Sequence, residues 1–453
     1  MATSDTLFTA KLTGRDYTTT DQRANLTGQA RYTGDFRAEG MLVCRLLTSP
    51  MPHARVKRLD TRAALAMPGV RAILTAAELP PPADLVTDIG EVIKASPYAE
   101  SALTMEPLYQ GDPILAVAAV DEASAVAALE AIDIDYEPLP FVIDPLDSLR
   151  PGGPNARGAR NVWLPPGKSG EPARIGNLKW TRADFEAAGD KQLPWGQAPS
   201  VWSFGDVEAG LQKAALVLDE TFVTPNVSHQ ALETRATLAW WENGKLHLVA
   251  GTQSTMQTVP AIARWMNMDA ADIVFISEYT GGGFGGKATA SIAVVIPALL
   301  AKKTKAPVMM RISREEEQYL GRARPSLLGR MRAGFSKEGR LTALDMLIVQ
   351  DNGPYEQVSD MANAGRMASL LYQPQAMRWR GVAVLTNTPT RGAQTGPGGV
   401  QVSAFMGPVL AKAAHRLGLD PLAVCRINAP EGQAPAGPPK PDGSLTPATS
   451  AFV

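Results

Sequence analysis

The segment that most constrains this chain is residues 281–287, Gly-Gly-Gly-Phe-Gly-Gly-Lys. Five glycines in seven positions leave few side chains, so the backbone amides can approach an anionic or oxo-bearing ligand closely. The residues at 273–276 predict a strand before the loop. The apolar run 288–303 predicts a helix after it, kinked at Pro297. A strand, a glycine-rich loop and a helix N-terminus in this order predict an anion-binding element.

Other interpretations of the same loop remain open. Gly281, Gly283 and Gly286 give a GxGxxG match, as in a dinucleotide-binding unit, but so many glycines make this match nearly automatic. The loop also reads Gly-x-x-x-x-Gly-Lys, as in a phosphate-binding P-loop. Ala288 lacks the hydroxyl group that a P-loop uses to hold magnesium. A tight structural turn without any ligand is the third alternative.

Composition narrows the class of protein. The chain has 453 residues, of which 45% are hydrophobic and 20% charged, which is typical of a globular protein with two or three domains. A formal net charge of -1 gives no overall attraction to nucleic acid. The longest apolar run, residues 292–301, is too short to span a bilayer, and the N-terminus shows no secretion signal. We therefore expect a cytoplasmic protein that binds neither nucleic acid nor membranes.

Cysteine and histidine usage argues against a metal held by protein side chains. Cys44 and Cys425 are the only cysteines, and each lies in a largely apolar stretch that predicts a buried free thiol. The four histidines lie far apart, without metal-binding spacing. Any redox chemistry therefore needs a cofactor whose ligands are not mainly histidine or cysteine.

The rest of the chain alternates between regular and irregular regions. Residues 28–144 show mixed strand and helix patterns, whereas residues 149–200 are rich in Pro and Gly without a steady period. Tryptophans in the second region prefer to pack, so we expect an ordered insertion or linker that runs over the surface. Regular patterns return from residue 203. The clearest are a hairpin across Asn243-Gly244, a helix at 255–266 and a helix at 402–417 ended by Gly418.

Several separated segments carry a resemblance to a known family. In the first third these are residues 26–35 (LTGQARYTGD), 47–55 (LTSPMPHAR), 109–112 (YQGD) and 136–140 (YEPLP). Further on they are residues 251–253 (GTQ), the glycine-rich loop, 387–389 (NTP), 396–401 (GPGGVQ) and 416–421 (RLGLDP). In this order they resemble the molybdopterin-binding subunit of the xanthine dehydrogenase and aldehyde oxidase family of molybdenum hydroxylases.

The resemblance implies a mixed α/β (α+β) chain with two folded regions. An α/β hammerhead domain is expected at residues 26–147, and the first molybdenum-cofactor-binding domain at residues 203–428. The remaining predicted parts are an N-terminal arm at 1–25, an inserted linker segment at 148–202 and an extended C-terminal arm at 429–453.

The resemblance also implies partners. Family chains continue through a second molybdenum-cofactor domain, in which a glutamate in a Gly-x-Gly-Glu setting acts as the base, and this chain contains no Gly-x-Gly-Glu. We therefore expect the N-terminal half of a split subunit, or a truncated chain. A second molybdenum-domain chain, a 2Fe-2S subunit and in some arrangements an FAD subunit would complete the enzyme. The implied cofactor is molybdenum-molybdopterin, with or without a cytidine nucleotide.

The implied activity is that of a molybdenum-dependent oxidoreductase, which hydroxylates or oxidises a small organic substrate. Because the pterin dithiolene holds the metal in this family, no metal ligand is expected from this chain. Gln253 matches the glutamine that the family aims at a molybdenum oxygen, and Phe284 matches the ring beside the metal and the substrate. Backbone contacts to the cofactor are implied for Gly282, Gly283 and Gly285. We expect Lys287 at the surface, where the following helix starts.

The substrate side departs from the family pattern at several positions. Thr395 replaces an arginine that pairs with carbonyl or acidic substrates, and Ala288 replaces a glutamate that binds purines. Gln394 replaces an aromatic side chain, next to Gly396 at the start of the second glycine loop. These changes predict a neutral, fairly apolar substrate instead of a purine, although Arg391 is a candidate replacement for the missing arginine.

Other hypotheses stay open at this point. His229 and Glu233 stand four residues apart and could form a metal pair, although structural hydrogen bonding is the favoured interpretation. The same cofactor could support a hydratase and dehydrogenase in place of a hydroxylase. A scaffold subunit with a decayed site is the remaining alternative.

Overall fold

The computed structural model describes residues 16–81, 85–86, 92–93, 96–166, 171, 173–189 and 191–449. Two large β-sheets, each covered by helices, organise this part of the chain. Within it, no helix is both long enough and apolar enough to cross a membrane.

The first sheet joins the N-terminal region to the middle of the chain. Its seven strands lie in the order β15-β14-β13-β16-β1-β6-β3. The central contact is the parallel pairing of β1 with β16, in which Leu42 lies opposite Val308. The predicted hammerhead segment and the segment that carries the glycine-rich loop therefore share one continuous sheet. The strands are β1 (Leu42–Thr48), β3 (Val70–Thr75), β6 (Pro113–Ala119), β13 (Ala236–Glu242), β14 (Lys245–Ala250), β15 (Ile273–Ile276) and β16 (Val308–Arg311).

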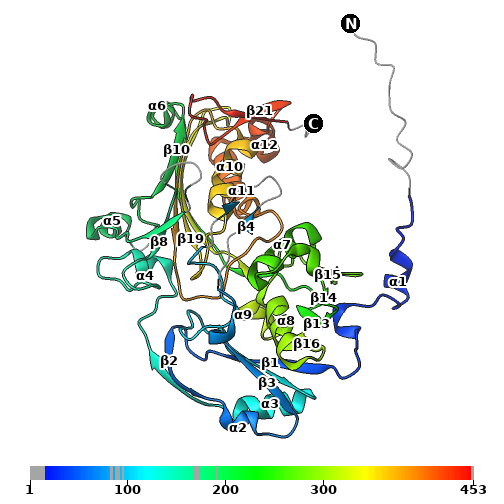
Figure 1. Cartoon of the computed structure of the whole chain (residues 1–453). Helices are drawn as coiled ribbons and strands as arrows, with labels where there is room; N and C mark the ends of the chain where they lie inside the picture. The colour runs from blue at the N-terminus through cyan, green and yellow to red at the C-terminus, as the bar shows by residue number, and fades with distance from the viewer. Residues whose placement is uncertain are drawn as a thin grey trace.

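Local sequence explains these elements. All seven residues of β6 are buried, as its unbroken apolar sequence predicts for a central strand. Asn243 and Gly244 both have positive φ in the turn between β13 and β14, so the predicted hairpin is confirmed. Helix α8 (Ile292–Thr304) packs on β13, β16 and β3, and α7 (Thr255–Met266) lies beside it. The lower part of Figure 1 contains α2 (Arg62–Leu65), α3 (Glu122–Glu130) and the pair formed by β2 (Ala54–Asp60) and β7 (Asp133–Pro138).

The second sheet lies at the upper left of Figure 1. Its strands follow the order β11-β18-β19-β20-β8-β9, and β10 pairs with β20. Helices α10 and α11 pack against it and bury a core that includes Phe405 and Met406. The strands are β8 (Val162–Leu164), β9 (Arg174–Gly176), β10 (Ser200–Phe204), β11 (Leu216–Thr224), β18 (Leu327–Phe335), β19 (Leu341–Asp351) and β20 (Met377–Val384). The helices are α6 (Val207–Gln212), α10 (Asp360–Tyr372), α11 (Gly399–Leu417) and α12 (Pro421–Asn428).

Two irregular regions differ from their predictions. The segment 148–202 is ordered and its tryptophans pack, as expected, but it does not run over the surface, because β8, β9 and β10 extend the second sheet and Trp163 and Trp180 are buried in the core. The predicted C-terminal arm instead folds back as a hairpin of β21 (Gln433–Ala436) and β22 (Thr446–Thr449) that packs on α10. In both regions, apolar side chains without a regular period become ordered by packing against a sheet or helix that lies far away in sequence.

Three smaller expectations also need correction. Cys44 is a buried free thiol as predicted, but Cys425 is exposed. The helix after the glycine-rich loop begins at Ile292 and not at residue 288, and Pro297 lies inside it. The remaining short elements are α1 (Gln22–Leu26), α4 (Pro145–Leu149), α5 (Arg182–Ala188), α9 (Glu317–Leu320), β4 (Leu85–Val86), β5 (Val92–Ile93), β12 (Val227–Ser228) and β17 (Ala323–Arg324).

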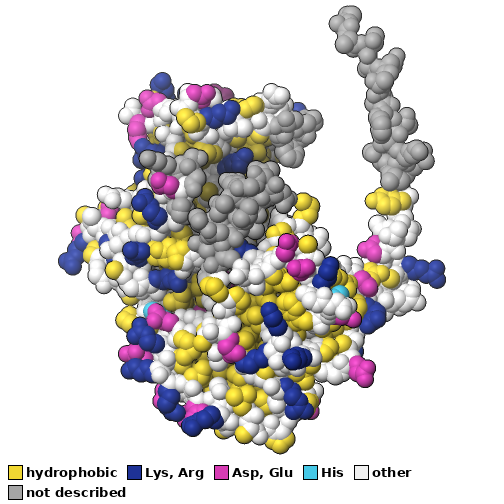
Figure 2. Space-filling view, in the orientation of Figure 1, with side chains coloured by type: hydrophobic (Ala, Val, Ile, Leu, Met, Phe, Trp, Pro, Cys, Tyr) yellow, Lys and Arg dark blue, Asp and Glu magenta, His cyan; other side chains and the backbone are white. Residues whose placement is uncertain are grey.

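Hydrophobic side chains gather on the surface over α8 and its neighbours (Figure 2). A cavity of about 230 Å³ opens beside this helix, with Pro80, Pro97, Trp265 and Val295 among the residues that line it. It lies apart from the glycine-rich loop, none of whose residues line it.

A buried carboxyl group joins the hammerhead segment to the second half of the chain. Asp112 accepts hydrogen bonds at one oxygen from the Leu108 N–H group (2.9 Å) and the Tyr355 O–H group (3.0 Å). Its other oxygen, Oδ1, has no hydrogen-bond partner among the described residues. Burial is the main cause that raises the pKa of Asp112 to about 7, and nearby Glu100 acts in the same direction.

This carboxyl group predicts a pH-dependent stability. Because the pKa of Asp112 is higher in the folded protein (about 7) than its ordinary value of 3.8, its contribution is fully present below pH 3.8 and is lost as the pH rises from there through 7. The loss amounts to roughly 1.4 kcal/mol per pH unit in that window. Asp112→Asn should therefore flatten the fall in melting temperature between pH 4 and 7. Asp147→Asn, at an exposed position, should leave the profile unchanged; equal profiles for wild type and Asp112→Asn would contradict the assignment.

Candidate functional site

The glycine-rich loop leaves β15 and returns toward α8 through a series of tight turns. Positive φ angles occur at Gly282 (+93°), Phe284 (+52°) and Gly285 (+106°). A Cβ atom on Gly283 would lie 2.3 Å from Gln253 Oε1, so no larger residue fits there without displacing that side chain. Phe284 is strained because a non-glycine residue rarely adopts this conformation, and such strain concentrates at functional sites.

Gln253 holds the loop from the turn between β14 and α7. Its Oε1 atom accepts hydrogen bonds from the backbone N–H groups of Gly285 (2.8 Å) and Lys287 (3.2 Å). Because both backbone groups are donors, they face the amide oxygen of Gln253, and the Nε2 group of the same amide points away from them. Among the residues that the structure describes, Nε2 has no hydrogen-bond partner. The side chain therefore supports the loop with its oxygen and retains a free donor.

Three consecutive backbone amides at the tip of the loop are also free. The N–H groups of Gly282, Gly283 and Phe284 have no hydrogen-bond acceptor within the described part of the chain. The ring of Phe284 lies beside Gly282 and is half-exposed. Free amides, the free Nε2 group of Gln253 and an exposed aromatic ring thus occupy one short segment.

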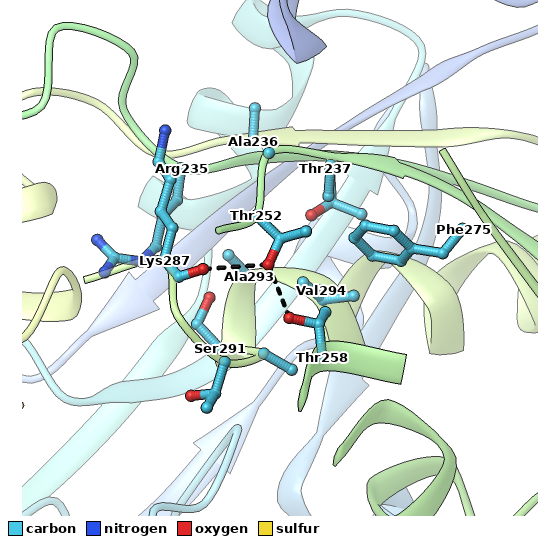
Figure 3. A pocket seen from close by; sticks show the side chains of 14 residues that line it. Arg235, Ala236, Thr237, Thr252, Thr258, Phe275, Lys287, Ser291, Ala293 and Val294 are labelled. Carbon is cyan, nitrogen blue, oxygen red and sulfur yellow. Dashed lines mark hydrogen bonds between the residues drawn. The ribbon is translucent and has the colours of Figure 1, made fainter. Parts of the chain in front are cut away.

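An open cavity of about 790 Å³ borders this segment. Gly281, Gly282 and Phe284 line it from the loop, and Leu232 and Glu233 line it from the preceding segment. A much smaller cavity of about 20 Å³ lies behind the loop (Figure 3). There the Thr252 hydroxyl group donates to the Lys287 carbonyl oxygen (3.1 Å) and pairs with the Thr258 hydroxyl group (2.8 Å). The loop is therefore packed tightly on its inner side and open on its outer side.

A second loop, residues 393–399, is bonded directly to the first. The Thr395 N–H group donates to the Phe284 carbonyl oxygen at 2.8 Å, and a Cβ atom on Gly285 would lie 2.4 Å from the Ala393 carbonyl oxygen. Thr395 and Gly396 are exposed and Ala288 is half-buried. The structure thus brings the predicted substrate-side residues next to the predicted cofactor loop.

The buried side chain of Arg324 stabilises this second loop through hydrogen bonds. Its buried guanidinium group donates to Gln394 Oε1 (2.8 Å), Gln401 Oε1 (2.9 Å) and the carbonyl oxygens of Thr395 (2.6 Å) and Gly396 (3.4 Å). The Gln394 side chain also donates to the Ser228 carbonyl oxygen. Gln394 therefore supports the second loop through both its amide oxygen and its amide nitrogen.

Two charged residues do not lie where the sequence suggests. Lys287 is buried, with its ammonium group 2.8 Å from Glu233 Oε2, and burial lowers its pKa while the bond to Glu233 opposes the shift. The prediction of a surface lysine is wrong. Arg391 is buried in an ion pair with Asp351 and also donates to Thr388. It cannot replace the missing arginine at Thr395.

His229 and Glu233 both make hydrogen bonds of the kind that the favoured, structural interpretation predicts. Their segment is not helical, so a spacing of four residues does not place both side chains together. The Nε2 group of His229 donates to the Ala393 carbonyl oxygen at 2.7 Å, and burial lowers the pKa of this histidine. No group of three or more potential metal-ligating side chains is found among the described residues.

The fold and this site define a protein with a glycine-rich loop whose backbone amides are free to bind a ligand. Residues 192–429 match the molybdopterin cofactor-binding domain family. Residues 27–140 match the a/b hammerhead domain of aldehyde oxidase and xanthine dehydrogenase. The chain therefore belongs to the xanthine dehydrogenase and aldehyde oxidase family and contains its molybdopterin-binding region.

Known relatives extend the comparison. A probable xanthine dehydrogenase subunit from Bacillus subtilis is 30% identical over 90% of this chain and 50% of its own length. The nicotinate dehydrogenase large molybdopterin subunit of Eubacterium barkeri is 27% identical over 92% of this chain and 89% of its own length. The chain thus spans about half the length of the Bacillus relative and most of the Eubacterium relative.

Solved structures share the fold. Aldehyde oxidoreductase from Desulfovibrio gigas superposes with a TM-score of 0.75 at 20% identity, over 92% of this chain and 43% of that one. A Cu,Mo-CO dehydrogenase superposes with a TM-score of 0.75 at 24% identity, over 92% of this chain and 51% of that one. At this level of identity, the likeness establishes the fold alone.

The residues present fit a molybdopterin cofactor. Free amides and the free Nε2 group of Gln253 can donate to oxo and pterin acceptors, and the glycines leave room for a close approach. Sequence reasoning missed two residues that make this possible, Arg235 and Arg324. Both donate to backbone carbonyl oxygens in the glycine loops, and no sequence pattern marks such acceptors.

Removing the Arg324 guanidinium group should loosen the second loop measurably. Arg324→Met leaves four acceptors without their donor, so the free energy of unfolding should fall by about 3 kcal/mol, measured by urea denaturation. Arg366→Met, at an exposed arginine on α10, should change it by less than about 0.5 kcal/mol. Equal losses in the two variants would show that the contacts of Arg324 do not stabilise the fold.

Proposed function

We propose that this chain forms one face of the cofactor site of a molybdenum hydroxylase-type oxidoreductase that acts on a neutral small organic substrate. The observations that carry the proposal are the unpartnered donors at 282–284 and on Gln253, and an open cavity of about 790 Å³ that Gly282 and Phe284 line. Membership of the molybdopterin-binding family supports the identity of the ligand.

Each residue has a distinct task in this proposal. Gln253 donates through Nε2 toward an oxygen of the cofactor, and a neutral amide does so without adding charge near the metal. The N–H groups of Gly282, Gly283 and Phe284 and the backbone of Gly285 line the cofactor. The Phe284 ring covers the substrate side and excludes water. When bound, the molybdenum cofactor supplies the oxygen-transfer and electron-accepting chemistry.

The other face of the cofactor is proposed to come from a second molybdenum-domain chain, which also brings the base glutamate. Large apolar side chains near the site are exposed: Leu232, which lines the cavity, is 95% exposed, and Met256, three residues after Gln253, is 87% exposed. Val400, beside the second loop, is also exposed. Apolar side chains in such positions are typical of a surface that a partner covers. Further partners in this proposal are a 2Fe-2S subunit and an FAD subunit that carry the electrons away.

The neutral substrate follows from the charges around the loops. Arg391 pairs with Asp351, and Arg324 is fully engaged with the second loop. Thr395 and Ala288 carry no charge. None of the predicted substrate-side positions therefore offers a free cation or carboxylate to match a charged substrate or a purine. The charged residues that line the cavity lie on other segments: Asp35, Arg37, Glu233 and Arg311.

Metal analysis and kinetics of the purified complex test the function. When the chain is co-expressed with the proposed partner subunits, the complex should contain about one molybdenum per copy of this chain, as family membership implies. It should oxidise neutral aldehydes or N-heterocycles when an artificial electron acceptor is present. A complex without molybdenum would instead indicate a scaffold. Addition of water to enones without an acceptor would indicate a hydratase.

Gln253→Glu separates the structural and functional roles of Gln253. The carboxylate keeps the acceptor for the Gly285 and Lys287 N–H groups but removes the Nε2 donor, so folding should persist. The value of kcat should fall by about 100-fold, the typical cost of losing one preorganised donor. Gln253→Ala removes the support as well and should also lower the melting temperature. Wild-type kinetics in Gln253→Glu would exclude a donor role.

Thr395→Arg tests the substrate class. Thr395 is exposed and holds Phe284 only through its backbone N–H group and a long hydroxyl contact. The substitution should therefore fold normally and present a guanidinium group to the substrate. The ratio of kcat/KM for an anionic over a neutral substrate should rise about tenfold, consistent with one bidentate contact. Thr395→Met is the uncharged control; an unchanged ratio in Thr395→Arg would place the substrate elsewhere.

A further inference from the structure

Glu233 makes an unusual number of contacts with the two ends of the glycine-rich loop. At the first end, its backbone N–H group donates to the Gly281 carbonyl oxygen (3.1 Å), and its Oε2 atom accepts the Gly281 N–H group (2.8 Å). At the second end, the Lys287 ammonium group donates both to Oε2 (2.8 Å) and to the Glu233 carbonyl oxygen (2.9 Å). One residue thus closes the seven-residue loop into a ring.

The same carboxylate also reaches the hammerhead segment. Its Oε1 atom accepts the Thr33 N–H group at 3.2 Å, across 200 positions of sequence. Oε2 lies 3.0 Å from the position that a Cβ atom on Gly251 would take, close to the turn that carries Gln253. Glu233 therefore contacts three separate segments around the loop.

A loop rich in glycine needs such hydrogen bonds from outside to hold its conformation. A run of glycines has no side chains that could anchor it and loses the most conformational freedom on ordering. The free amides at 282–284 are useful only if their directions are fixed before the ligand binds. Arg235, two residues after Glu233, adds a contact to the Gly286 carbonyl oxygen and pairs with Glu317. The Arg235–Glu317 pair is buried, and in the other pair Lys287 is buried while the Glu233 side chain is 11% exposed, so each charge depends on its partner.

We propose that Glu233 is a positioning residue that aims the amides of the glycine-rich loop at the cofactor by tying Gly281 to Lys287. The proposal rests on the proposed function, since it assumes that a molybdopterin is the ligand of those amides. Glu233 itself does not touch the reacting atoms. Its contribution passes through the loop, and it should affect how the cofactor is held before it affects the overall fold.

The test uses the holoenzyme complex with Glu233→Gln. The molybdenum content per complex, measured by mass spectrometry, should fall about 10- to 100-fold. This is the typical effect of mutating a residue that orients the groups around a metal without contacting the metal itself. The fraction that remains loaded should show an altered Mo(V) electron paramagnetic resonance spectrum. Lys287→Met in the Glu233→Gln background leaves no unpaired buried charge and should recover part of the molybdenum content.

Asp345→Asn is the matched control. Asp345 is also a buried carboxylate with arginine partners, Arg378 and Arg380, but it lies in the second sheet away from the loop. It should lower the melting temperature without changing molybdenum content or the spectrum.

Three results would overturn the role of Glu233 or of the site. Wild-type molybdenum content and spectrum in Glu233→Gln would overturn it. So would equal losses in Asp345→Asn, because the effect would then be general destabilisation. If Glu233→Gln does not fold, the double variant carries the same test. A wild-type complex without molybdenum would instead defeat the proposed function.

Discussion

The site depends on a loop that cannot hold its own shape. Residues 281–287 expose backbone groups because they have almost no side chains, and for the same reason their conformation must be fixed by residues outside the loop. Gln253 Oε1, the Glu233 carboxylate and the Arg235 guanidinium group supply it through hydrogen bonds to the main chain. Several hydrogen bonds to one short segment make its backbone rigid. The directions of the free amides follow from that rigidity.

The two sheets meet at this loop. The first sheet delivers the glycine-rich loop and Gln253, while the second sheet and α11 deliver the second loop. The bond from Thr395 to Phe284 and the buried Arg324 join the two loops into one surface. The hammerhead segment belongs to the same unit, since β1 pairs with β16 and Thr33 bonds to Glu233. A cofactor face assembled in this way needs all three regions of the chain.

Sequence patterns predicted the secondary-structure elements that depend on interactions between residues close together in the chain. The hairpin at Asn243-Gly244, the helix α7 and the end of α11 at Gly418 follow from turn and capping preferences that act over a few residues. Strands β8 and β9 could not be recognised. They are short and irregular in pattern, and they are stabilised by pairing with β20 and with each other and by burial of Trp163 and Ile175.

By itself, the sequence determined the family, the glycine-rich loop and the presence of Gln253 and Phe284 beside it, because these depend on residue type and order. Only the tertiary structure decided the roles of the charged residues. From the sequence, Lys287 is expected at the surface, but in the structure it is buried against Glu233. Arg391 is a candidate for substrate binding from the sequence, but in the structure it is paired with Asp351. The physical reason is that the energy of a charge depends on its desolvation and on its partners. Those partners lie 40 to 54 positions away in the sequence and become neighbours only in the folded chain.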